Sequence, residues 1–311
     1  AALFREALLD TQAEDFSALS GELGHVLSAT GHGRAAAQAF LAAAARASVE
    51  DKLQLQSQAG AQLLRSGFLD EGIEVLQLVL SQLKIRLPES PRTSAILGFL
   101  RRQYTELRGL SCAIHDEKEC SPADLQKLDV LHSVTIAYSM SHGMRASDVL
   151  GRLTAATLQV GEPFRLAQTL LLCAAFWATR GARKHAVNQR YVDRAIEVGG
   201  KLGKPLFFAY LSLCTGVMAY LEGRFAVARD DLREAERRLR AFPGVAWELE
   251  VAMRYSLSAQ MFLGEYRELA QRSDKILRDA VGRDDAYTES TMRPTVLYFA
   301  ELLRDDAKAA W

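Results

Sequence analysis

Apolar side chains recur at intervals of three and four positions between residues 225 and 242, and the residues between them are charged or small. This spacing predicts an amphipathic helix that buries one stripe and exposes the rest of its surface to water. The stripe consists of Phe225, Ala228, Leu232, Ala235, Leu239 and Phe242. The charged face also predicts two ion pairs at the four-residue spacing of helical neighbours. These pairs are Glu234 with Arg238 and Glu236 with Arg240.

A glycine-containing turn precedes this stripe, and the same combination of turn and stripe recurs along the chain, most clearly after Gly67 and Gly264. The glycines that mark such turns are Gly31, Gly67, Gly109, Gly143, Gly181, Gly223 and Gly264, at intervals of 34 to 42 residues. Each interval has room for two helices of about 15 residues and two short turns. The helix before a turn, as in residues 206–222, is apolar on more than one side, which is typical of a helix between two neighbours.

No segment alternates apolar and polar residues with a period of two between turn signals, so no strand is predicted. The pattern predicts an all-α fold, a right-handed solenoid of antiparallel helix pairs with about 14 to 15 helices. Its period is close to that of tetratricopeptide superhelices but looser. We expect residues 1–311 to form one continuous repeat domain, a piece of a larger multidomain protein, with a long polar loop near residues 110–121.

Composition narrows the classes of partner and the compartment. The chain has 38 basic and 38 acidic residues, so its formal net charge gives no general attraction for nucleic acid or anionic membranes. One basic and aromatic cluster, "FLRRQY" at residues 99–104, is isolated. The uncharged run at residues 205–221 is shorter than the roughly 20 strongly apolar residues of a membrane span. Four scattered cysteines favour a reduced compartment. We therefore expect a cytoplasmic protein that binds neither nucleic acid nor membrane.

Candidate chemistry in the chain is sparse. The stretch "GGKLGKP" at residues 199–205 is one residue short of a phosphate-binding loop and has Pro where Ser or Thr must reach magnesium. Cys112, His115 and Cys120 have part of a zinc-site spacing, and acidic residues nearby could complete four ligands, but the missing fourth Cys or His favours a solvated loop. His132 and His142 are expected to pack or cap helices. We predict no catalytic residue, no cofactor and no metal site.

Several long stretches of the chain resemble a known helical region. They include "LLRSGFLDEGIEVLQLVLSQLKIRLPESPR", "VGEPFRLAQTLLLCAAF" and "GVAWELEVAMRYSLSAQMFLGEYRELAQRSDKILRDAVGRDDAYTESTMR". They resemble the tetratricopeptide-like array that follows the ATPase module in large bacterial signal-transduction proteins carrying an N-terminal serine/threonine protein kinase domain. The resemblance covers most of residues 51–311. It implies partner binding at the matching polar positions, which are Glu162, Arg165, Trp247, Glu248, Asp285, Tyr287 and Arg293.

The resemblance also sets the expected function. The sequence contains no "HRD", no "DFG" and no glycine-rich nucleotide loop, so kinase or ATPase activity would belong to other domains of such a parent. We therefore expect a non-enzymatic helical-repeat scaffold that binds a protein or peptide segment, including the parent's own kinase or ATPase domains. The alternative is a small-molecule effector sensor, which an enclosed pocket with a few converging polar groups would favour over an open groove.

Overall fold

The computed structural model describes residues 13–242 and 245–282, together with residues 292, 296, 298–303, 305 and 308. Fourteen α-helices and four short 3-10 helices lie in this described part of the chain, and no strand does. The predicted all-α class is confirmed. The chain groups into two compact units, Ala1–Gly161 and Glu162–Trp311. The prediction of one continuous repeat domain over residues 1–311 stays a prediction.

The helices are short enough for a two-helix repeat, and most span 12 to 20 residues. The first unit contains α2 (Ala13–Ala29), α3 (Gly33–Ala44), α4 (Val49–Arg65), α5 (Leu69–Gln82), α6 (Pro91–Arg108), α7 (Pro122–Ser141) and α8 (Gly143–Val160). The second contains α9 (Pro163–Trp177), α10 (His185–Gly199), α11 (Pro205–Leu221), α12 (Phe225–Leu239), α13 (Ala246–Leu263), α14 (Tyr266–Gly282) and α16 (Tyr298–Leu303).

Helix starts in both units follow local chemistry. Four helices begin at a proline, whose fixed φ suits the first turn and whose missing N–H leaves no unpaired donor there. At the start of α4, the Ser48 side chain accepts a hydrogen bond from the Asp51 N–H at 3.2 Å. At the end of α8, Gly161 adopts φ 73° and stops the helix.

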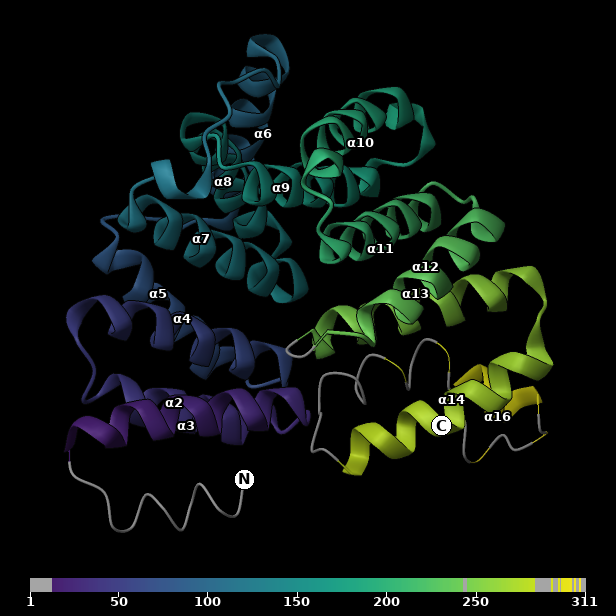
Figure 1. Ribbon diagram of the computed structural model, residues 1–311. Coiled ribbons are helices and arrows are strands. Elements are labelled where there is room, and N and C mark those ends of the chain that lie inside the picture. Colours follow the sequence, from purple (N-terminus) through teal and green to yellow (C-terminus); the bar gives the residue numbers. More distant parts are fainter. Residues whose placement is uncertain are drawn as a thin grey trace. The chain divides into compact units, whose positions relative to one another are not determined.

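In the first unit, neighbouring helices pack in chain order from α2 to α5, but α6 interrupts the order (Figure 1). Helix α7 packs on α4, and α8 packs on α7. Helix α6 packs on α8, from which it is separated in sequence by α7 and a long connection. That connection, residues 109–121, holds only the 3-10 helix Glu117–Glu119, and it lies where the sequence predicts a long loop.

Three pairs of consecutive helices share the same kind of close contact at a glycine. In each pair, a Cβ atom on a glycine of the first helix would lie 2.6 or 2.7 Å from a large side chain sixteen positions later. The pairs are Gly24 with Phe40, Gly60 with Leu76, and Gly216 with Leu232. A methyl group at these positions would overlap its neighbour, so glycine permits the short distance between the helix axes.

The second unit contains the stripe that the sequence predicts in α12. Ala228, Leu232, Ala235 and Leu239 are fully buried, and α12 packs on α11 and α13. Phe225 and Phe242, at the two ends of the stripe, are only partly buried. Phe225 stacks on Phe262 of α13, with 4.5 Å between the ring centroids. The prediction that this helix buries one stripe is confirmed.

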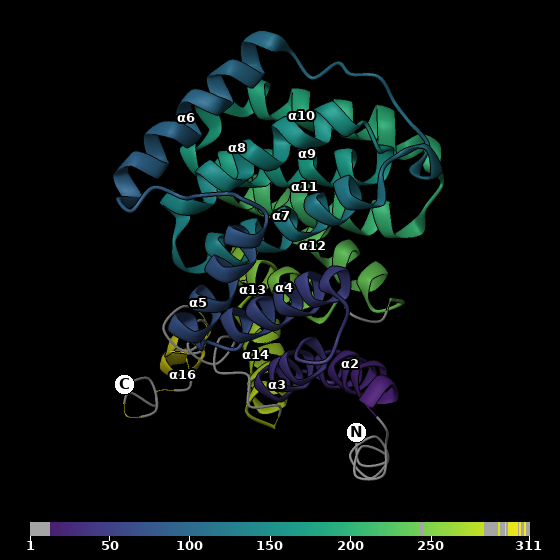
Figure 2. The ribbon, with the colours of Figure 1, turned by 90° about the vertical axis from the view of Figure 1, so that its left-hand side faces the viewer.

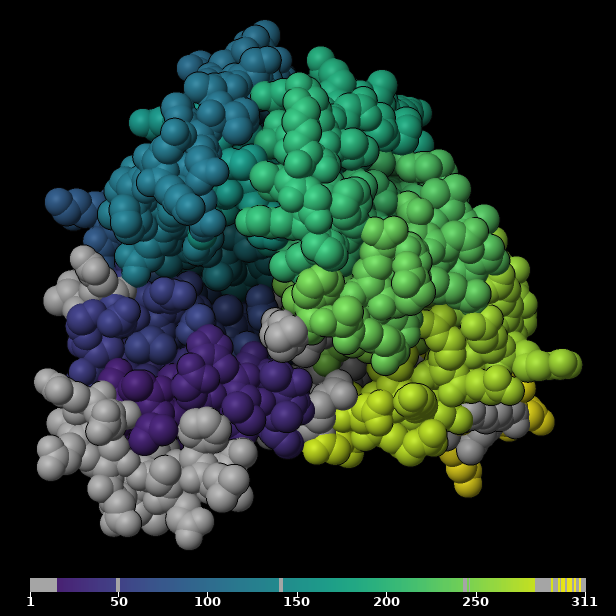
Figure 3. Space-filling model, viewed as in Figure 1, coloured from purple at the N-terminus to yellow at the C-terminus, as the bar shows by residue number. Residues whose placement is uncertain are grey.

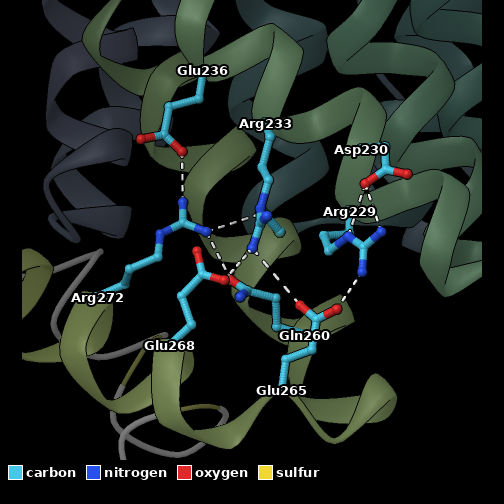
Figure 4. A network of polar contacts seen from close by, with 9 residues as sticks. Arg229, Asp230, Arg233, Glu236, Gln260, Glu265, Glu268 and Arg272 are labelled. Carbon is cyan, nitrogen blue, oxygen red and sulfur yellow. Dashed lines mark hydrogen bonds and ion pairs between the residues drawn. The ribbon is translucent and has the colours of Figure 1, made fainter.

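The charged face of α12 joins a polar network with α13 and α14 (Figure 4). Arg272 of α14 donates to Glu236 Oε2 at 2.6 Å and to the buried Gln260 Oε1 at 2.7 Å. Arg233 donates to Glu268 Oε2 at 2.6 Å. Neighbouring amphipathic helices are thereby joined across their polar faces as well as through their apolar stripes.

The two predicted ion pairs within α12 also form. Arg238 Nε donates to Glu234 Oε1 at 2.6 Å, and Arg240 Nη2 donates to Glu236 Oε1 at 2.6 Å. Arg237 and Arg238 hold the Glu234 carboxylate from both sides and lower its pKa to about 2. Both pairs lie within one helix and are in contact with solvent on the arginine side, so they are expected to contribute only a few tenths of a kcal/mol each.

The substitution Gly24→Ala tests the close contact between α2 and α3. A Cβ atom there would lie 2.6 Å from the Phe40 ring, so we expect a loss of about 1–3 kcal/mol in the free energy of unfolding. Gly21→Ala is the matched control in the same helix, because its Cβ would meet Leu55 at an ordinary 3.7 Å. Alanine there should be neutral or stabilising by up to ~1 kcal/mol. Urea unfolding measures both, and equal effects would contradict the packing explanation.

The substitution Arg272→Ala tests the network between α12, α13 and α14. It leaves the fully buried Gln260 amide oxygen without its donor, so we expect a loss of about 1–3 kcal/mol in unfolding free energy. Arg237→Ala removes an arginine whose side chain is 69% exposed, and its effect should stay within about 0.5 kcal/mol. The two urea-unfolding midpoints would coincide if the network contributed no stability.

Candidate protein-docking surface

The first two sequence-predicted site residues act together at the start of α9. The Glu162 side chain is buried and accepts hydrogen bonds from the N–H groups of Phe164 at 3.0 Å and Arg165 at 2.7 Å. The Arg165 guanidinium also lies 3.4 Å from the same carboxylate. A carboxylate at this position satisfies free N–H groups and interacts favourably with the helix dipole. These contacts give Glu162 a structural role as the cap of α9.

The next two predicted site residues, Trp247 and Glu248, lie at the start of α13. Trp247 is partly buried against the apolar cluster of the second unit, and Glu248 is buried. The Tyr210 hydroxyl of α11 donates to Glu248 Oε1 at 3.5 Å. Burial, with a smaller contribution from the Glu248 charge, raises the pKa of the nearby Cys214 thiol to about 12. Helix α11 packs on both α9 and α13, the helices that carry the two predicted pairs.

The remaining three predicted positions, Asp285, Tyr287 and Arg293, lie outside the described residues. The structure therefore brings Glu162 together with Arg165, and places Trp247 beside Glu248.

The polar loop that carries Cys112, His115 and Cys120 is held by its own backbone and by the end of α8. The His115 N–H donates to the Gly161 carbonyl at 3.1 Å. Asp116 and Glu119 form a capping box around the short 3-10 helix. Within the described part of the chain, no three His, Cys, Asp or Glu side chains are arranged to hold a metal ion. None of the described helices combines the length and apolarity needed to cross a membrane.

His132 and His142 both belong to the packing of α7. His132 is half-buried, and burial is the main cause that lowers its pKa to about 4. The charge of Arg65 also lowers this pKa, while Asp129 raises it. At the junction of α7 and α8, the His142 N–H donates to the Tyr138 carbonyl at 2.7 Å.

The feature that stands out on the surface is α6, whose apolar side chains face away from the body of the first unit. Five large apolar residues recur on one side of α6 at helical spacing. Their exposed fractions are 60% for Ile96, 54% for Phe99, 54% for Leu100, 65% for Tyr104 and 88% for Leu107. We name these five residues the α6 stripe. In the space-filling view, this segment of the chain projects at the top (Figure 3).

The opposite side of α6 consists of small or polar residues, and this side is buried. Its buried residues are Ser94, Gly98, Arg102 and Thr105. Gly98 lies directly against the α8 backbone, since a Cβ there would be 2.6 Å from the Ser147 carbonyl carbon. On α8, a Cβ at Gly151 would be 2.8 Å from the Arg101 Cβ. The two helices therefore touch along their small residues. Figure 2 shows α6 alongside α8.

Ion pairs fix the rotation of α6 on α8. Asp148 of α8 is fully buried and accepts from Arg101 Nε at 2.8 Å and from Arg152 Nε at 3.3 Å. Two arginines of α8 also hold the segment before α6, because Arg152 Nη2 donates to the Arg86 carbonyl at 3.3 Å and Arg145 Nη2 to the Glu89 carbonyl at 3.1 Å. A rotation of α6 that buried the α6 stripe would separate Arg101 from the buried carboxylate, which is costly.

The exposed area is large for a protein surface. Five such side chains at these exposed fractions present on the order of 500 Å² of apolar surface, near the upper end for a single patch on a monomer. Patches of this size commonly mark sites of association. The sequence reading of "FLRRQY" as a basic and aromatic cluster missed this stripe, although its three-four spacing is visible from residue 96 to residue 107.

A second feature is a hollow of about 430 Å³ along α2 and α4. Its lining includes Glu22 and His25 of α2, Arg46 of the α3–α4 connection, and Asp51 of α4. The hollow is open to solvent and its lining carries both signs of charge, so it is a groove and not an enclosed pocket.

No protein-family model matches this chain, and no curated protein matches it. The resemblance to the helical region of bacterial kinase and ATPase signalling proteins therefore stays a prediction.

The lowered pKa of His132 predicts a pH-dependent stability. The unfolded chain binds a proton at this residue near pH 6.5, whereas the folded chain does so only near pH 4. Stability should therefore fall as the pH falls from 6.5 to 4, by up to about 3 kcal/mol from this residue. His132→Gln should remove that part of the slope, and the exposed His32→Gln should not. Urea unfolding across this range checks both, and equal slopes in all three proteins would refute the assignment.

Proposed function

We propose that this chain is a non-enzymatic helical-repeat scaffold that docks another protein segment on α6. The observation that carries the proposal is the α6 stripe, which ion pairs to α8 hold outward in the free chain. When an apolar surface is already fixed in position, the backbone of the scaffold needs little further ordering to bind a partner, and the main cost is the ordering of the exposed side chains.

A tetratricopeptide-like, right-handed superhelix is the arrangement we propose for the helix pairs. Twelve positions after Gly24, Gly60 and Gly216 lie the buried residues Ala36, Gly72 and Ala228, and four positions further lie Phe40, Leu76 and Leu232. In tetratricopeptide repeats a glycine in the first helix is followed by an alanine and, four positions after that, an aromatic residue in the second. Ala36 and Phe40 match this pattern fully. In the second pair Gly72 replaces the alanine and Leu76 the aromatic residue, and in the third pair Leu232 replaces the aromatic residue.

Polar contacts between side chains support the same repeat. Seven of them join residues 34 to 38 positions apart, which is close to one repeat. They are Ser28 with Gln62, Arg34 with Glu71, His185 with Glu222, Tyr210 with Glu248, Arg229 with Glu265, Arg233 with Glu268, and Glu236 with Arg272. Contacts of this span are expected when each repeat touches only its neighbours.

The resemblance suggests the setting of this scaffold. We propose a cytoplasmic role in a bacterial signalling protein, where binding of a segment to the scaffold shifts a kinase or ATPase module between inactive and active arrangements. The partner is a protein or peptide segment, and the parent's own kinase or ATPase domains are the first candidates. Loss of the scaffold should then change the parent's autophosphorylation, and an unchanged response would contradict this setting.

A small-molecule effector sensor is the second candidate function, and the groove along α2 and α4 is the feature that favours it. Its lining offers charged and amide groups, including Glu22, Arg46 and Gln54. The groove is open, whereas small-molecule sites usually bury most of their ligand. The α6 stripe therefore supports the scaffold more strongly than the groove supports the sensor.

A photo-reactive amino acid at position 107 tests docking on α6 directly. Leu107 is 88% exposed, so the probe should not disturb the fold and should form a covalent adduct with the docked protein in cells that express the chain. The control is the same probe at Arg237, whose side chain is 69% exposed on the charged face of α12. Adding Ile96→Gln and Leu100→Gln should reduce the adduct at position 107 several-fold, while unfolding stability changes by less than about 0.5 kcal/mol. Equal adducts at positions 107 and 237 would contradict docking on α6.

A further inference from the structure

The charges on α6 that lack an ion-pair partner have one sign. Helix α6 carries four arginines and one glutamate. Arg101 is paired with Asp148, and Arg102 is paired with Glu106. The other two, Arg92 and Arg108, are exposed near the two ends of the stripe. Among the described residues, no carboxylate lies within ion-pair distance of either one. On α6 itself, the charge left without an ion-pair partner is therefore positive near both ends of the stripe.

The positions of these arginines define the dimensions of a partner. Arg92 and Arg108 are sixteen residues apart, which is about 24 Å along a helix at 1.5 Å per residue. Between them, the members of the α6 stripe recur at the three-four spacing with which one helix packs against another. An extended strand has a period of two and would match this ridge at few points. A second helix of about the same length matches it along its whole extent.

We infer that the partner segment docked on α6 is an acidic amphipathic helix, with an apolar seam facing the α6 stripe and Asp or Glu near both ends. The inference rests on the proposed docking function of α6. Carboxylates placed opposite Arg92 and Arg108 would complete two ion pairs at the rim of an apolar contact, where charges determine specificity and orientation.

A second copy of this chain fits the same surface poorly. If two α6 helices met in antiparallel orientation, Arg92 of one would lie opposite Arg108 of the other, and in parallel orientation each arginine would meet its own counterpart. Like charges would face one another in both cases. An anionic lipid surface would attract only two exposed arginines here, which is weak compared with the clusters of basic residues typical of lipid-binding segments.

Two labelled synthetic helical peptides of 18 residues test the inference on the whole chain. Both carry the same leucine seam, but one has Glu on its flanks and the other has Lys. We expect the Glu peptide to bind roughly three- to tenfold more tightly at low salt, as two rim ion pairs would produce. The advantage should shrink at high salt and reverse in the variant Arg92→Glu with Arg108→Glu, with circular dichroism confirming its fold.

The outcomes separate this inference from the proposed function. Equal affinity for the two peptides, or tighter binding of the Lys peptide, would overturn the acidic partner but keep docking on α6. If neither peptide bound, or if Leu100→Gln with Leu107→Gln left binding unchanged, both proposals would be wrong. Two further results would also overturn the inference. In the first, the chain sediments with phosphatidylserine vesicles, Leu107→Gln abolishes this sedimentation, and the chain binds the Glu and Lys peptides equally. In the second, the chain forms a dimer that the double variant Leu100→Gln with Leu107→Gln abolishes.

Discussion

Close approach of neighbouring helices at positions without a large side chain is the constraint on which both units depend. In α2, α4 and α11 a glycine receives a large side chain from the following helix, and in α6 and α8 Gly98 and Gly151 bring the two backbones together. Because protein interiors are close-packed, a contact of this kind tolerates little change of register or rotation. It therefore fixes which face of each helix is buried and which is left to the solvent.

At α6 this constraint has an unusual result. The buried contact with α8 is built from small and polar residues around Asp148, a fully buried carboxylate held by two arginines. A buried charge is tolerated only with its partners in place, so the ion pairs oppose any rotation of α6. The α6 stripe consequently stays in water, although burial of apolar surface is worth about 25 cal/mol per Å². A helix whose apolar face is held outward is free to bury it against another molecule.

The polar contacts show how a chain with no net charge can still have strong local electrostatics. On α12, Arg229 and Arg233 pair with Glu265 and Glu268, and Glu236 pairs with Arg272 of α14. Arg238 pairs with Glu234 one turn away on the same helix. Around the α6 stripe the pairing is incomplete, because Arg92 and Arg108 have no carboxylate partner among the described residues. The balance of 38 basic and 38 acidic residues conceals this difference between the paired charges of α12 and the arginines of α6 that have no ion-pair partner among the described residues.

The sequence by itself determined the features that depend on neighbours along the chain. The three-four spacing of apolar residues predicted the helices and the buried stripe of α12, and the four-residue spacing predicted the ion pairs of Glu234 and Glu236. A polar stretch predicted the loop between α6 and α7. The resemblance singled out Glu162 as a partner-binding position, whereas its contacts as the cap of α9 depend on the path of the backbone.

Only the tertiary structure decided that the α6 stripe faces the solvent. Helical periodicity shows that the apolar residues between positions 96 and 107 share one face of a helix. The ordinary expectation is that such a face is buried. Whether it is buried depends on α8, which begins 35 residues after α6 ends and supplies Asp148 and Gly151. The local pattern contains no information on that distant partner. The outward direction of the stripe follows from long-range packing and buried charge, which no stretch of the chain specifies alone.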